Sequence, residues 1–492
     1  MPNPPLRLFD RSAAVRTAAF AASGIPLYFV LGLRPIWWLA WFAPLPLLAL
    51  SWRSGGASTR WPGYLAALIG LSVNFRYYRT VLSLPLAIAV VLVQAWLWVF
   101  VVQASRRVVA RYAAWWTAFA YPVIWVAVDT FLAALLPDGN WGSLAYTQTP
   151  FLPIMQTASL FGTAGVVFLV CLVPSTLAVA IVFGRRLRRA GLLYGATLAL
   201  VGGAVAFGAV RLRQPIQGRP TTFGLVAIDD AIGPRASASY MKSIWDAYDR
   251  QIEVLGKQGA EIIVLPEKIG LVSPEVAQQW QRHLSALAAS HNVWIEAGAA
   301  VFGAGSQANV SWLFVGDGSL AATYQKHHLA PPERHALPPT IAGTTYTVQA
   351  MAGRTYGLAI CKDMHFASLG RVYGLRGVST MLVPAWDFGL DGWLEARTTS
   401  VRGVENGYGI VRCAREGLMT VSDAYGRVVA EAPSGPLPGK SLLVTTNVAA
   451  QLPVLYTQVG NLFGWICVAA AAGFLVFGRG AGQGNARERG PG

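Results

Sequence analysis

Charged residues are scarce in this sequence, and acidic residues are the scarcer kind. Of its 492 residues only 13% are charged, with 23 Asp and Glu against 39 Lys and Arg, whereas an average soluble domain carries about 25% charge. Hydrophobic residues make up 54% of the chain and include 18 tryptophans. This composition excludes an ordinary soluble protein and predicts an integral membrane protein embedded in a lipid bilayer.

The excess of basic residues gives a formal net charge of +16. The arginines lie mostly at the ends of apolar runs instead of forming a stripe with interleaved aromatic residues. This placement argues against a nucleic-acid partner and is typical of residues that set membrane topology and anchor lipid headgroups.

Cysteine is also scarce, with four in the chain and no CxxC pair. Cys171 and Cys467 fall inside predicted membrane spans, whereas Cys361 and Cys413 fall in a more polar stretch. A disulfide between the last two is one alternative in an oxidising compartment. Apolar neighbours favour a core position for Cys413, while Cys361 is either a core residue or an exposed nucleophile at the end of a strand.

Long apolar runs divide the chain, because about 20 apolar residues are needed for a helix to cross a bilayer. The predicted spans are residues 17–33, 35–51, 62–78, 81–103, 113–135, 163–184, 190–210 and 457–478. We therefore expect a membrane domain of about seven helices over 1–212, a soluble domain over 220–449, a last membrane helix over 457–478 and a disordered cytoplasmic tail over 479–492.

Arginine placement predicts the orientation, since basic residues in short loops favour the cytoplasm. With the N-terminus in the cytoplasm, the face opposite to it keeps few arginines near span ends. They are Arg34, Arg76, Arg79, Arg211 and Arg213. The soluble domain is therefore expected outside the cytoplasm, in a periplasm or its equivalent.

Residues 136–162 are too polar and turn-rich at their start for a clean span. Two interpretations stay open: the segment dips into the membrane where protein covers its backbone, or it is a plain extracytoplasmic loop.

The stretch from 220 to 449 alternates short β-rich runs with amphipathic helices, a pattern that predicts an α/β domain with a sheet core. The expected strands are 222–228, 261–265, 293–301, 310–315, 356–361, 380–383, 409–414 and 418–422. The expected helices are 241–257, 274–290 and 393–405.

Three residues that follow predicted strands combine into a chemical set. Glu267 follows the run Ile262–Leu265, Lys326 follows Ala321–Gln325, and Cys361 ends Tyr356–Cys361. A thiol nucleophile needs a base to take its proton and a cation to stabilise developing negative charge, and Glu, Lys and Cys supply these roles together. The alternative is that Glu267 and Lys326 form an ordinary ion pair in a noncatalytic domain.

Short motifs around these residues resemble the three signatures of the nitrilase superfamily, in the same order: Leu-Pro-Glu267-Lys, Tyr-Gln-Lys326-His-His-Leu and Ala-Ile-Cys361-Lys-Asp. Such a domain inserted before a last membrane span is the arrangement of the apolipoprotein N-acyltransferase family. The segment Asn140–Gln148 is similar to the aromatic and Tyr-x-Gln segment of that family. The resemblance implies a multi-span α-helical membrane protein with an inserted α/β nitrilase-like domain, an αββα sandwich.

Carried over to this sequence, the resemblance implies that Glu267 is the general base, Lys326 the oxyanion-stabilising cation and Cys361 the nucleophile. Glu333 resembles a second, supporting glutamate of the family. Trp386 and Asp387 resemble landmarks that wall the pocket, and we expect them to bind substrate together with Tyr146 and Gln148. Glu405, in Arg402–Gly407, is expected to be structural. Apart from the resemblance, we expect the backbone N–H of Lys362 to donate to the oxyanion.

The resemblance further implies a function in the bacterial inner membrane. A membrane phospholipid would donate an acyl chain to Cys361, and the resulting thioester would pass it to the α-amino group of a lipoprotein's diacylglyceryl-cysteine. No cofactor is expected. His327, His328, His335 and His365 lie near the motifs, but their spacing matches no HExxH pattern, so no metal is expected.

This sequence departs from the family pattern beside the nucleophile, where Lys362 and Asp363 replace an aromatic residue and a glutamate. The departure leaves other acceptors open, and a membrane-tethered amidase or hydrolase is the first alternative. A transporter is the second, although Asp129 is the only acidic residue plainly within a predicted span.

Overall fold

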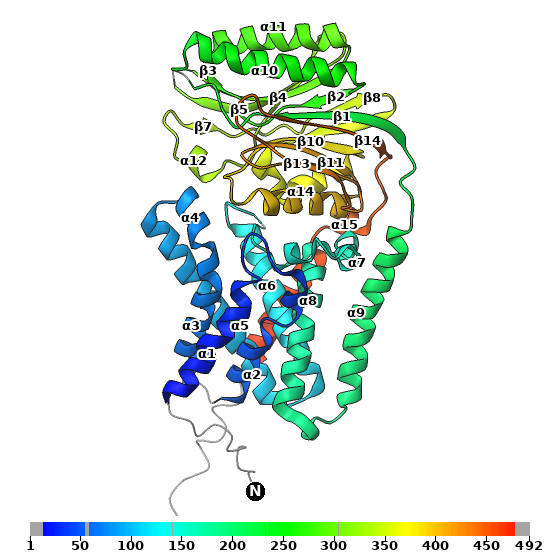
Figure 1. Cartoon of the computed structure of the whole chain (residues 1–492). Coiled ribbons are helices and arrows are strands. Elements are labelled where there is room, and N and C mark those ends of the chain that lie inside the picture. The colour runs from blue at the N-terminus through cyan, green and yellow to red at the C-terminus, as the bar shows by residue number, and fades with distance from the viewer. Residues whose placement is uncertain (1–12, 55–58, 140, 234, 304, 478–492) are drawn as a thin grey trace, which may run out of the picture.

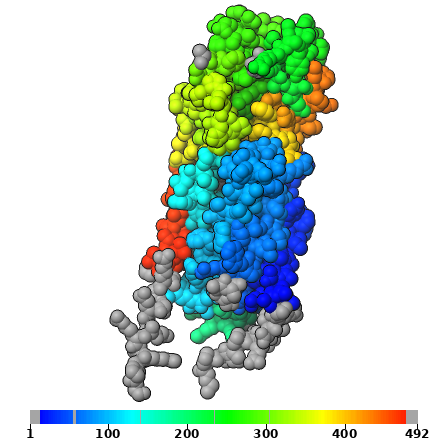
Figure 2. Space-filling view, turned by 90° about the vertical axis from the view of Figure 1, so that its left-hand side faces the viewer, coloured from blue at the N-terminus to red at the C-terminus, as the bar shows by residue number. Residues whose placement is uncertain are grey.

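A helical part and an α/β part are stacked end to end in the computed structural model (Figure 1). The structure describes residues 13–477 except 55–58, 140, 234 and 304. The predicted tail, 479–492, therefore lies outside the described residues, as does Asn140 of the Tyr-x-Gln segment. Figure 2 shows the two parts in continuous contact, with the first helices beneath the α/β part.

The helical part is built from apolar helices of very different lengths. Its helices are α1 (Ala13–Tyr28), η1 (Trp37–Trp41), α2 (Leu45–Arg53), α3 (Arg60–Leu71), η3 (Ser72–Asn74), α4 (Phe75–Val81), α5 (Leu84–Tyr112), η4 (Trp115–Phe119), α6 (Ala120–Leu135), η5 (Leu144–Gln148), α7 (Leu152–Met155), α8 (Ala158–Phe183), η6 (Gly184–Arg186) and α9 (Ala190–Leu212). Within the described residues, four helices are long and apolar enough to cross a membrane: α5, η4 with α6, α8 and α9.

These four helices lie where the sequence predicts spans. The earlier predicted runs 17–33, 35–51 and 62–78 overlap shorter helices, with irregular backbone between Tyr28 and Trp37. Pro35 lies in this break, and a proline cannot donate the backbone hydrogen bond that would continue a helix. The count of seven crossings in this part stays a prediction.

The α/β part contains two sheets packed face to face between layers of helices. Its strands are β1 (Arg219–Ala227), β2 (Ile262–Val264), β3 (Leu271–Val272), β4 (Trp294–Phe302), β5 (Gln307–Phe314), β6 (Leu320–Gln325), β7 (Thr340–Ile341), β8 (Val348–Met351), β9 (Arg354–Leu358), β10 (Thr380–Trp386), β11 (Gly409–Arg415), β12 (Leu418–Ser422), β13 (Val428–Pro433) and β14 (Lys440–Val448). One sheet has the order β14-β1-β2-β4-β5-β6, and the other has the order β13-β12-β11-β10-β9-β8.

Helices cover the outer face of each sheet, which makes the predicted αββα sandwich. They are α10 (Ala238–Lys257) and α11 (Pro274–His291) on the first sheet, and α13 (Ala367–Leu375) and α14 (Gly392–Asn406) on the second. Alternate residues of each strand point to opposite faces. On β1, Val226 therefore packs in the core beneath α10 and α11, while Phe223 and Leu225 pack in the core between the sheets.

The α/β part begins and ends on neighbouring strands. β1 pairs antiparallel with β14 along its whole length, so that Arg219 lies opposite Val448. After β14 the chain returns to the helical part through α15 (Leu455–Val459) and α16 (Leu462–Phe477). The predicted last span over 457–478 therefore begins within α15 and is broken near Gly460. The α/β part is thus inserted into the helical part through one edge of one sheet.

Candidate active site

Cys361 lies at a sharp corner between β9 and the short helix η7 (Cys361–His365). The strand ends at Leu358, so the predicted strand 356–361 is too long by three residues. Cys361 has φ 46°, a left-handed conformation that costs a non-glycine residue on the order of 1–2 kcal/mol. Its side chain is partly buried and its Sγ donates to the carbonyl oxygen of Trp386 at 3.5 Å. The corner holds the thiol at the ends of β9 and β10.

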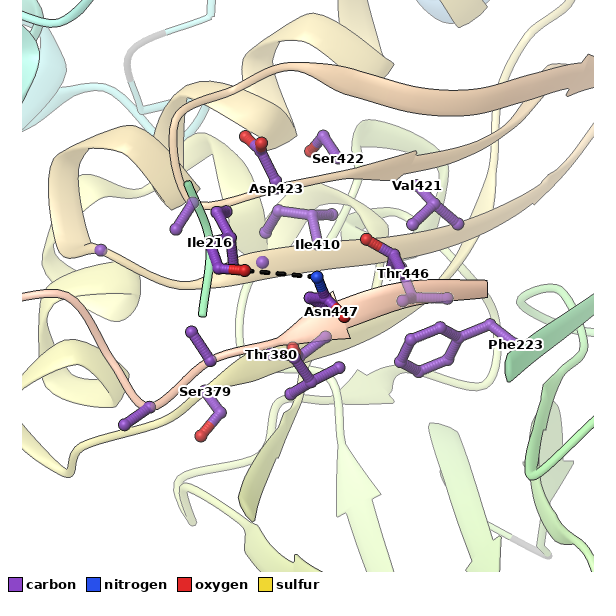
Figure 3. Close-up of a pocket in the computed structure, with 17 residues that line it drawn as sticks. Ile216, Phe223, Ser379, Thr380, Ile410, Val421, Ser422, Asp423, Thr446 and Asn447 are labelled. Atoms are coloured by element: carbon purple, nitrogen blue, oxygen red, sulfur yellow. Dashed lines mark hydrogen bonds between the residues drawn. The ribbon is translucent and has the colours of Figure 1, made fainter. Parts of the chain in front are cut away.

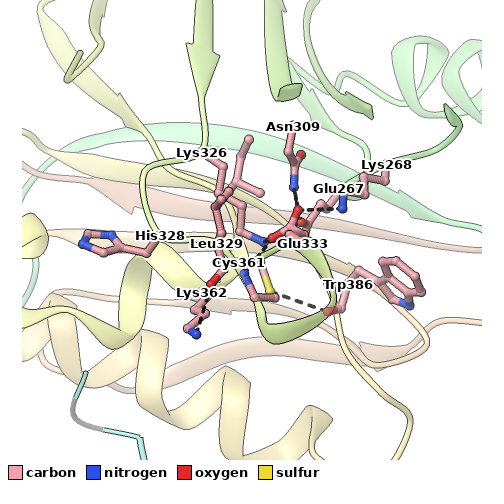
Figure 4. A network of polar contacts seen from close by, with 12 residues as sticks. Glu267, Lys268, Asn309, Lys326, His328, Leu329, Glu333, Cys361, Lys362 and Trp386 are labelled. Carbon is pink, nitrogen blue, oxygen red and sulfur yellow. Dashed lines mark hydrogen bonds and ion pairs between the residues drawn. The ribbon is translucent and has the colours of Figure 1, made fainter. Parts of the chain in front are cut away.

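Glu267, Lys326 and Glu333 form a buried charge network beside this thiol (Figure 4). Lys326 Nζ lies 2.7 Å from Glu267 Oε1 and 3.0 Å from Glu333 Oε2. Lys326 follows β6, and Glu267 follows β2 after Leu265 and Pro266. The fold therefore brings together four residues that the sequence separates by up to 94 positions, from Glu267 to Cys361.

Two further residues, Lys268 and Asn309, hold the carboxylates of this network in place. Lys268 Nζ lies 2.6 Å from Glu333 Oε1, and Asn309 Nδ2 donates to Glu267 Oε1 at 2.5 Å and to Glu333 Oε1 at 2.7 Å. Neither residue was predicted from the sequence. Lys268 follows the motif glutamate directly, but Asn309 sits in β5 and carries no local signal, because only sheet pairing places it there.

Burial and nearby charges together shift the pKa values of the Lys326 ammonium and the Cys361 thiol. Burial lowers the pKa of Lys326, but the carboxylates of Glu267 and Glu333 more than offset it, so this pKa lies well above its ordinary value. Burial raises the pKa of the Cys361 thiol, and the Glu267 carboxylate raises it further, while Lys326 opposes both. These shifts favour the charged form of Lys326 and the neutral form of the Cys361 thiol, and a neutral thiol needs a base in order to act as a nucleophile.

Asp363 fastens the turn after Cys361 to the loop after Lys326. Its fully buried carboxylate accepts hydrogen bonds from the backbone N–H groups of His328 at 2.8 Å and His327 at 3.1 Å, and from the Tyr324 hydroxyl at 2.7 Å. The His328 ring contacts the same carboxylate at 3.2 Å. The departure from the family pattern at Asp363 thus has a structural role in holding the corner.

Trp386 and Asp387, predicted to bind substrate, lie at the end of β10 near Cys361. The Trp386 ring lies under the Arg415 guanidinium, 3.9 Å from ring centroid to Cζ. The fully buried Asp387 carboxylate accepts a hydrogen bond from Arg412 Nη1 at 3.0 Å and a second from Arg412 Nη2. Trp386 thus contacts the Cys361 corner through its carbonyl oxygen. A substrate role for either stays a prediction.

Tyr146 and Gln148, also predicted to bind substrate, lie in η5 of the helical part, outside the charge network. The Tyr146 hydroxyl accepts a hydrogen bond from Arg402 Nη2 of α14 at 3.0 Å. Gln148 Oε1 accepts from Trp41 Nε1 at 2.8 Å, and Gln148 Nε2 donates to the Trp37 carbonyl oxygen at 3.0 Å. These contacts join η5 to η1 and to the α/β part.

A cavity of about 460 Å³ lies in the helical part, within the range of about 300–1,000 Å³ typical of small-molecule sites. Its wall is mostly apolar and comes from the segment after α1, from α3 to α6, from the loop after α6, from η5 with Tyr146, and from Leu394 of α14. Representative lining residues are Leu86, Val93, Trp98, Leu132, Trp141 and Leu394. The cavity therefore extends from the apolar helices up to the helix behind the Cys361 corner.

A second pocket lies near the start of β10, at the end of that strand away from Cys361. There Asn447 Nδ2 donates to the Ile216 carbonyl oxygen at 3.3 Å (Figure 3). Its volume is about 20 Å³, room for about one water molecule. Thr380 lines it at the start of β10, whereas Trp386 ends the same strand near Cys361. This pocket is too small and too distant to be part of the site. Among the described residues, no three His, Cys, Asp or Glu side chains group as metal ligands.

Comparisons with known proteins agree with the motifs in both parts of the chain. A family model described as the apolipoprotein N-acyltransferase N-terminal domain matches residues 22–176, and the carbon-nitrogen hydrolase model matches residues 236–438. The chain is 26% identical to an apolipoprotein N-acyltransferase of Geobacter metallireducens, and the match covers 72% of each chain. The helical part thus carries the N-terminal domain of apolipoprotein N-acyltransferases, and the α/β part carries a carbon-nitrogen hydrolase domain.

A second relative from the same family, from Bradyrhizobium diazoefficiens, is also 26% identical, over 72% of this chain and 73% of its own. Among solved structures, an amidase from Nesterenkonia sp. aligns with a TM-score of 0.42 and 21% identity, over 49% of this chain and 94% of its own. The two family models and the two relatives confirm the predicted resemblance. The helical part and the two packed sheets confirm the predicted fold class, and the protein is a membrane protein and an enzyme of the carbon-nitrogen hydrolase superfamily.

Proposed function

We propose that this protein is an apolipoprotein N-acyltransferase that uses Glu267, Lys326 and Cys361 as its catalytic residues. It would move a fatty acyl chain from a membrane phospholipid to the α-amino group of the N-terminal S-diacylglyceryl-cysteine of lipoproteins. The observation that carries the proposal is the buried network around Lys326, set against the Cys361 corner and above an apolar cavity. Both curated relatives have this name.

In the first half-reaction, Glu267 takes the Cys361 proton as the sulfur attacks the ester carbonyl of a phospholipid. The raised pKa of the thiol means that proton removal accompanies the attack. The Lys326 ammonium and the backbone N–H of Lys362 stabilise the oxyanion, since N–H groups in the first turn of a helix such as η7 have no partner within it. The C–O bond then breaks, and the proton on Glu267 passes to the departing lysophospholipid oxygen.

In the second half-reaction, the lipoprotein amine attacks the thioester carbonyl. Glu267 accepts a proton from the attacking nitrogen, and the C–S bond breaks as the amide forms. The sulfur leaves with that proton as the Cys361 thiol, which restores the starting state. Glu333 takes no proton in this scheme. Burial raises the pKa of Glu333, but Lys326 and Lys268 lower it below its ordinary value. The Glu333 carboxylate therefore stays charged and keeps Lys326 charged.

The helical part supplies the lipid environment that both substrates need. The apolar cavity reaches from α5 and α6 to Leu394 of α14, which supports it as the place that holds an acyl chain of the donor. We propose that the donor enters this cavity sideways from the bilayer. The arginine distribution supports a bacterial inner-membrane location with the catalytic domain on the periplasmic side.

A membrane-tethered amidase or hydrolase at the same thiol is a second candidate, supported by the carbon-nitrogen hydrolase model that covers residues 236–438. The two candidates differ in the group that resolves the thioester, which is an amine in one and water in the other. A hydrolase releases free fatty acid from phospholipid alone, whereas the transferase holds the acyl group on Cys361 until the amine arrives.

The test is the intact mass of the purified full-length protein after incubation with phospholipid and no acceptor. We expect a fatty acyl mass on Cys361 that a diacylglyceryl-cysteine peptide then removes as an N-acyl product. Cys361→Ala abolishes the adduct. The matched control is Cys413→Ala, because Cys413 is fully buried in β11 and its loss leaves the adduct in place. Steady release of free fatty acid without an adduct favours the hydrolase, and an adduct that persists in Cys361→Ala rejects the proposed nucleophile.

A further inference from the structure

A loop of the helical part reaches the turn that carries Cys361. It connects α6 to η5, and its residue Asp138 contacts two cations of the α/β part. Asp138 Oδ1 accepts a hydrogen bond from Lys362 Nζ, and it lies 3.4 Å from Arg334 Nη2. Arg334 Nη1 also donates to the carbonyl oxygen of Pro137 at 3.0 Å. The residue next to the nucleophile is thus tied to a carboxylate from the membrane domain.

The Asp138–Lys362 pair is asymmetric in its burial. The side chain of Lys362 is 5% exposed, whereas that of Asp138 is 49% exposed. Among the described residues the Lys362 ammonium has one other hydrogen-bond acceptor, the carbonyl oxygen of Leu329 at 3.2 Å. A buried ammonium without a counter-charge is costly, so loss of Asp138 affects Lys362 more than loss of an ordinary surface ion pair would.

Two more contacts from the same loop reach the other end of the turn. Gly139 has φ +59°, and a Cβ built there would lie 2.9 Å from the carbonyl oxygen of His365, so the loop passes close to η7. Trp141 Nε1 donates to Glu395 Oε1 at 3.0 Å, and Glu395 Oε2 lies 2.6 Å from His365 Nε2. The loop therefore contacts η7 at Lys362 and at His365, on either side of the centre of this helix.

We propose that Asp138 is a positioning residue for the nucleophile. It keeps Lys362 charged and in place, and so fixes the corner that aims the Cys361 thiol and the Lys362 N–H at the substrate carbonyl. The inference rests on the proposed function, because it concerns the rate at which Cys361 is acylated. It makes the geometry of the thiol depend on the membrane domain, which binds the lipid.

The pKa values of Lys362 and Asp138 depend on the charged groups that face each of them. Those facing Lys362 are Asp138, Arg334 and Lys326, and those facing Asp138 are Lys362, Arg334 and His365. Burial lowers the pKa of Lys362, and Asp138 opposes this lowering. Without the carboxylate, the Lys362 pKa falls further, and the ammonium loses its proton at a lower pH.

The experiment measures the rate of Cys361 acylation against pH in full-length protein, for wild type and Asp138→Asn. We expect a loss on the order of ten- to a hundredfold at neutral pH, together with an alkaline limb that begins at a lower pH than in wild type. Asp138→Glu restores most of the rate. In a Lys362→Arg background, Asp138→Asn no longer moves the alkaline limb, because arginine keeps its charge.

The matched control is Glu431→Gln, which removes the carboxylate of the Arg397–Glu431 pair, at 2.6 Å in the same domain. It is expected to leave the pH profile unchanged. A uniform rate loss in Asp138→Asn, with no shift of the alkaline limb, would overturn the inference, and so would a wild-type profile. Failure of wild-type protein to acquire the acyl group counts against the proposed function instead, so the two outcomes are distinguishable.

Discussion

The two helix layers of the α/β part bury their residues in different ways. The outer helices α10 and α11 bury one face each, and the buried residues of α10 are the apolar or aromatic Ile244, Ala247, Tyr248, Ile252 and Leu255. Their charges lie in water, as in the Lys242–Asp246 pair, whose side chains are 74% and 42% exposed. This is the one-faced pattern of an ordinary amphipathic helix.

The inner helix α14 buries almost every residue, because the sheet covers one side and the helical part covers the other (Figure 1). Its buried charges have partners across that boundary. Arg402 donates to the Tyr146 hydroxyl at 3.0 Å and lies 2.8 Å from Glu405, which accepts from the backbone N–H of Thr163 at 3.1 Å. Polar sequence in this helix therefore means contact with another domain instead of contact with water.

The largest expected effect comes from removing the buried charge of α14. Arg402→Met leaves the Glu405 carboxylate buried without its cation, and breaking a buried pair in this way costs about 3–5 kcal/mol. Thermal unfolding of the detergent-solubilised protein should show a marked fall in the midpoint temperature. A midpoint within a degree or two of wild type would mean that the boundary charges contribute little.

A second substitution tests the backbone of α8, where this helix packs against α15. Gly162, near the start of α8, has φ +65°, and an added Cβ would lie 2.4 Å from the Tyr456 ring. Gly162→Ala is expected to destabilise the protein by about 1–3 kcal/mol from this backbone conformation alone, because it is essentially restricted to glycine, with the ring contact adding to it. The control is Gly191→Ala in α9, where an added Cβ meets nothing within 4 Å. Equal unfolding midpoints for the two variants would contradict the expectation.

Glu296 in β4 is a buried carboxylate that, unlike the carboxylate of Glu405, contacts a hydroxyl and not a cation. Ser311 Oγ donates to it at 2.8 Å. Burial raises the pKa of Glu296 to about 8. The folded state therefore holds the proton more tightly than the unfolded state, and stability falls by about 1.4 kcal/mol per pH unit between the ordinary pKa and about 8. Glu296→Gln removes this dependence. Its unfolding midpoint should exceed that of wild type more at pH 8 than at pH 5, and parallel pH profiles would contradict this.

The smallest effect is expected on the outer layer. Lys242→Ala removes an exposed i,i+4 ion pair of α10, which is worth about 0.3–0.5 kcal/mol. The midpoint of unfolding should hardly change, and the change should shrink further in high salt because the pair is solvent-screened. A fall in the midpoint as large as that of Arg402→Met would show that burial does not determine how much these charges contribute to stability.

Much of the soluble fold was predictable from short apolar runs. The expected strands 293–301 and 418–422 and the expected helix 274–290 match β4, β12 and α11 to within one residue. Strands β13 and β14 were missed. In β13, exposed and half-buried positions alternate without a strong apolar run, so the pattern that predicts a strand is weak there.

The proposed catalytic residues could be placed at strand ends from sequence, whereas their neighbours could not. Glu267, Lys326 and Cys361 stand in local motifs, and the structure puts them beside one another. Asn309, by contrast, reaches Glu267 through sheet pairing, and Asp138 reaches Lys362 across the boundary between the two parts. Such contacts depend on tertiary packing, which leaves no periodic trace in the chain.

The pairing of β1 with β14 has a consequence for how this architecture is assembled. The α/β part leaves and rejoins the helical part through two adjacent strands, with Arg219 opposite Val448. A module joined in this way can be added to, or taken from, a single loop without rethreading any helix of the host. The enzyme is thus modular at the level of chain connectivity, even though the Asp138–Lys362 ion pair joins its two modules beside Cys361.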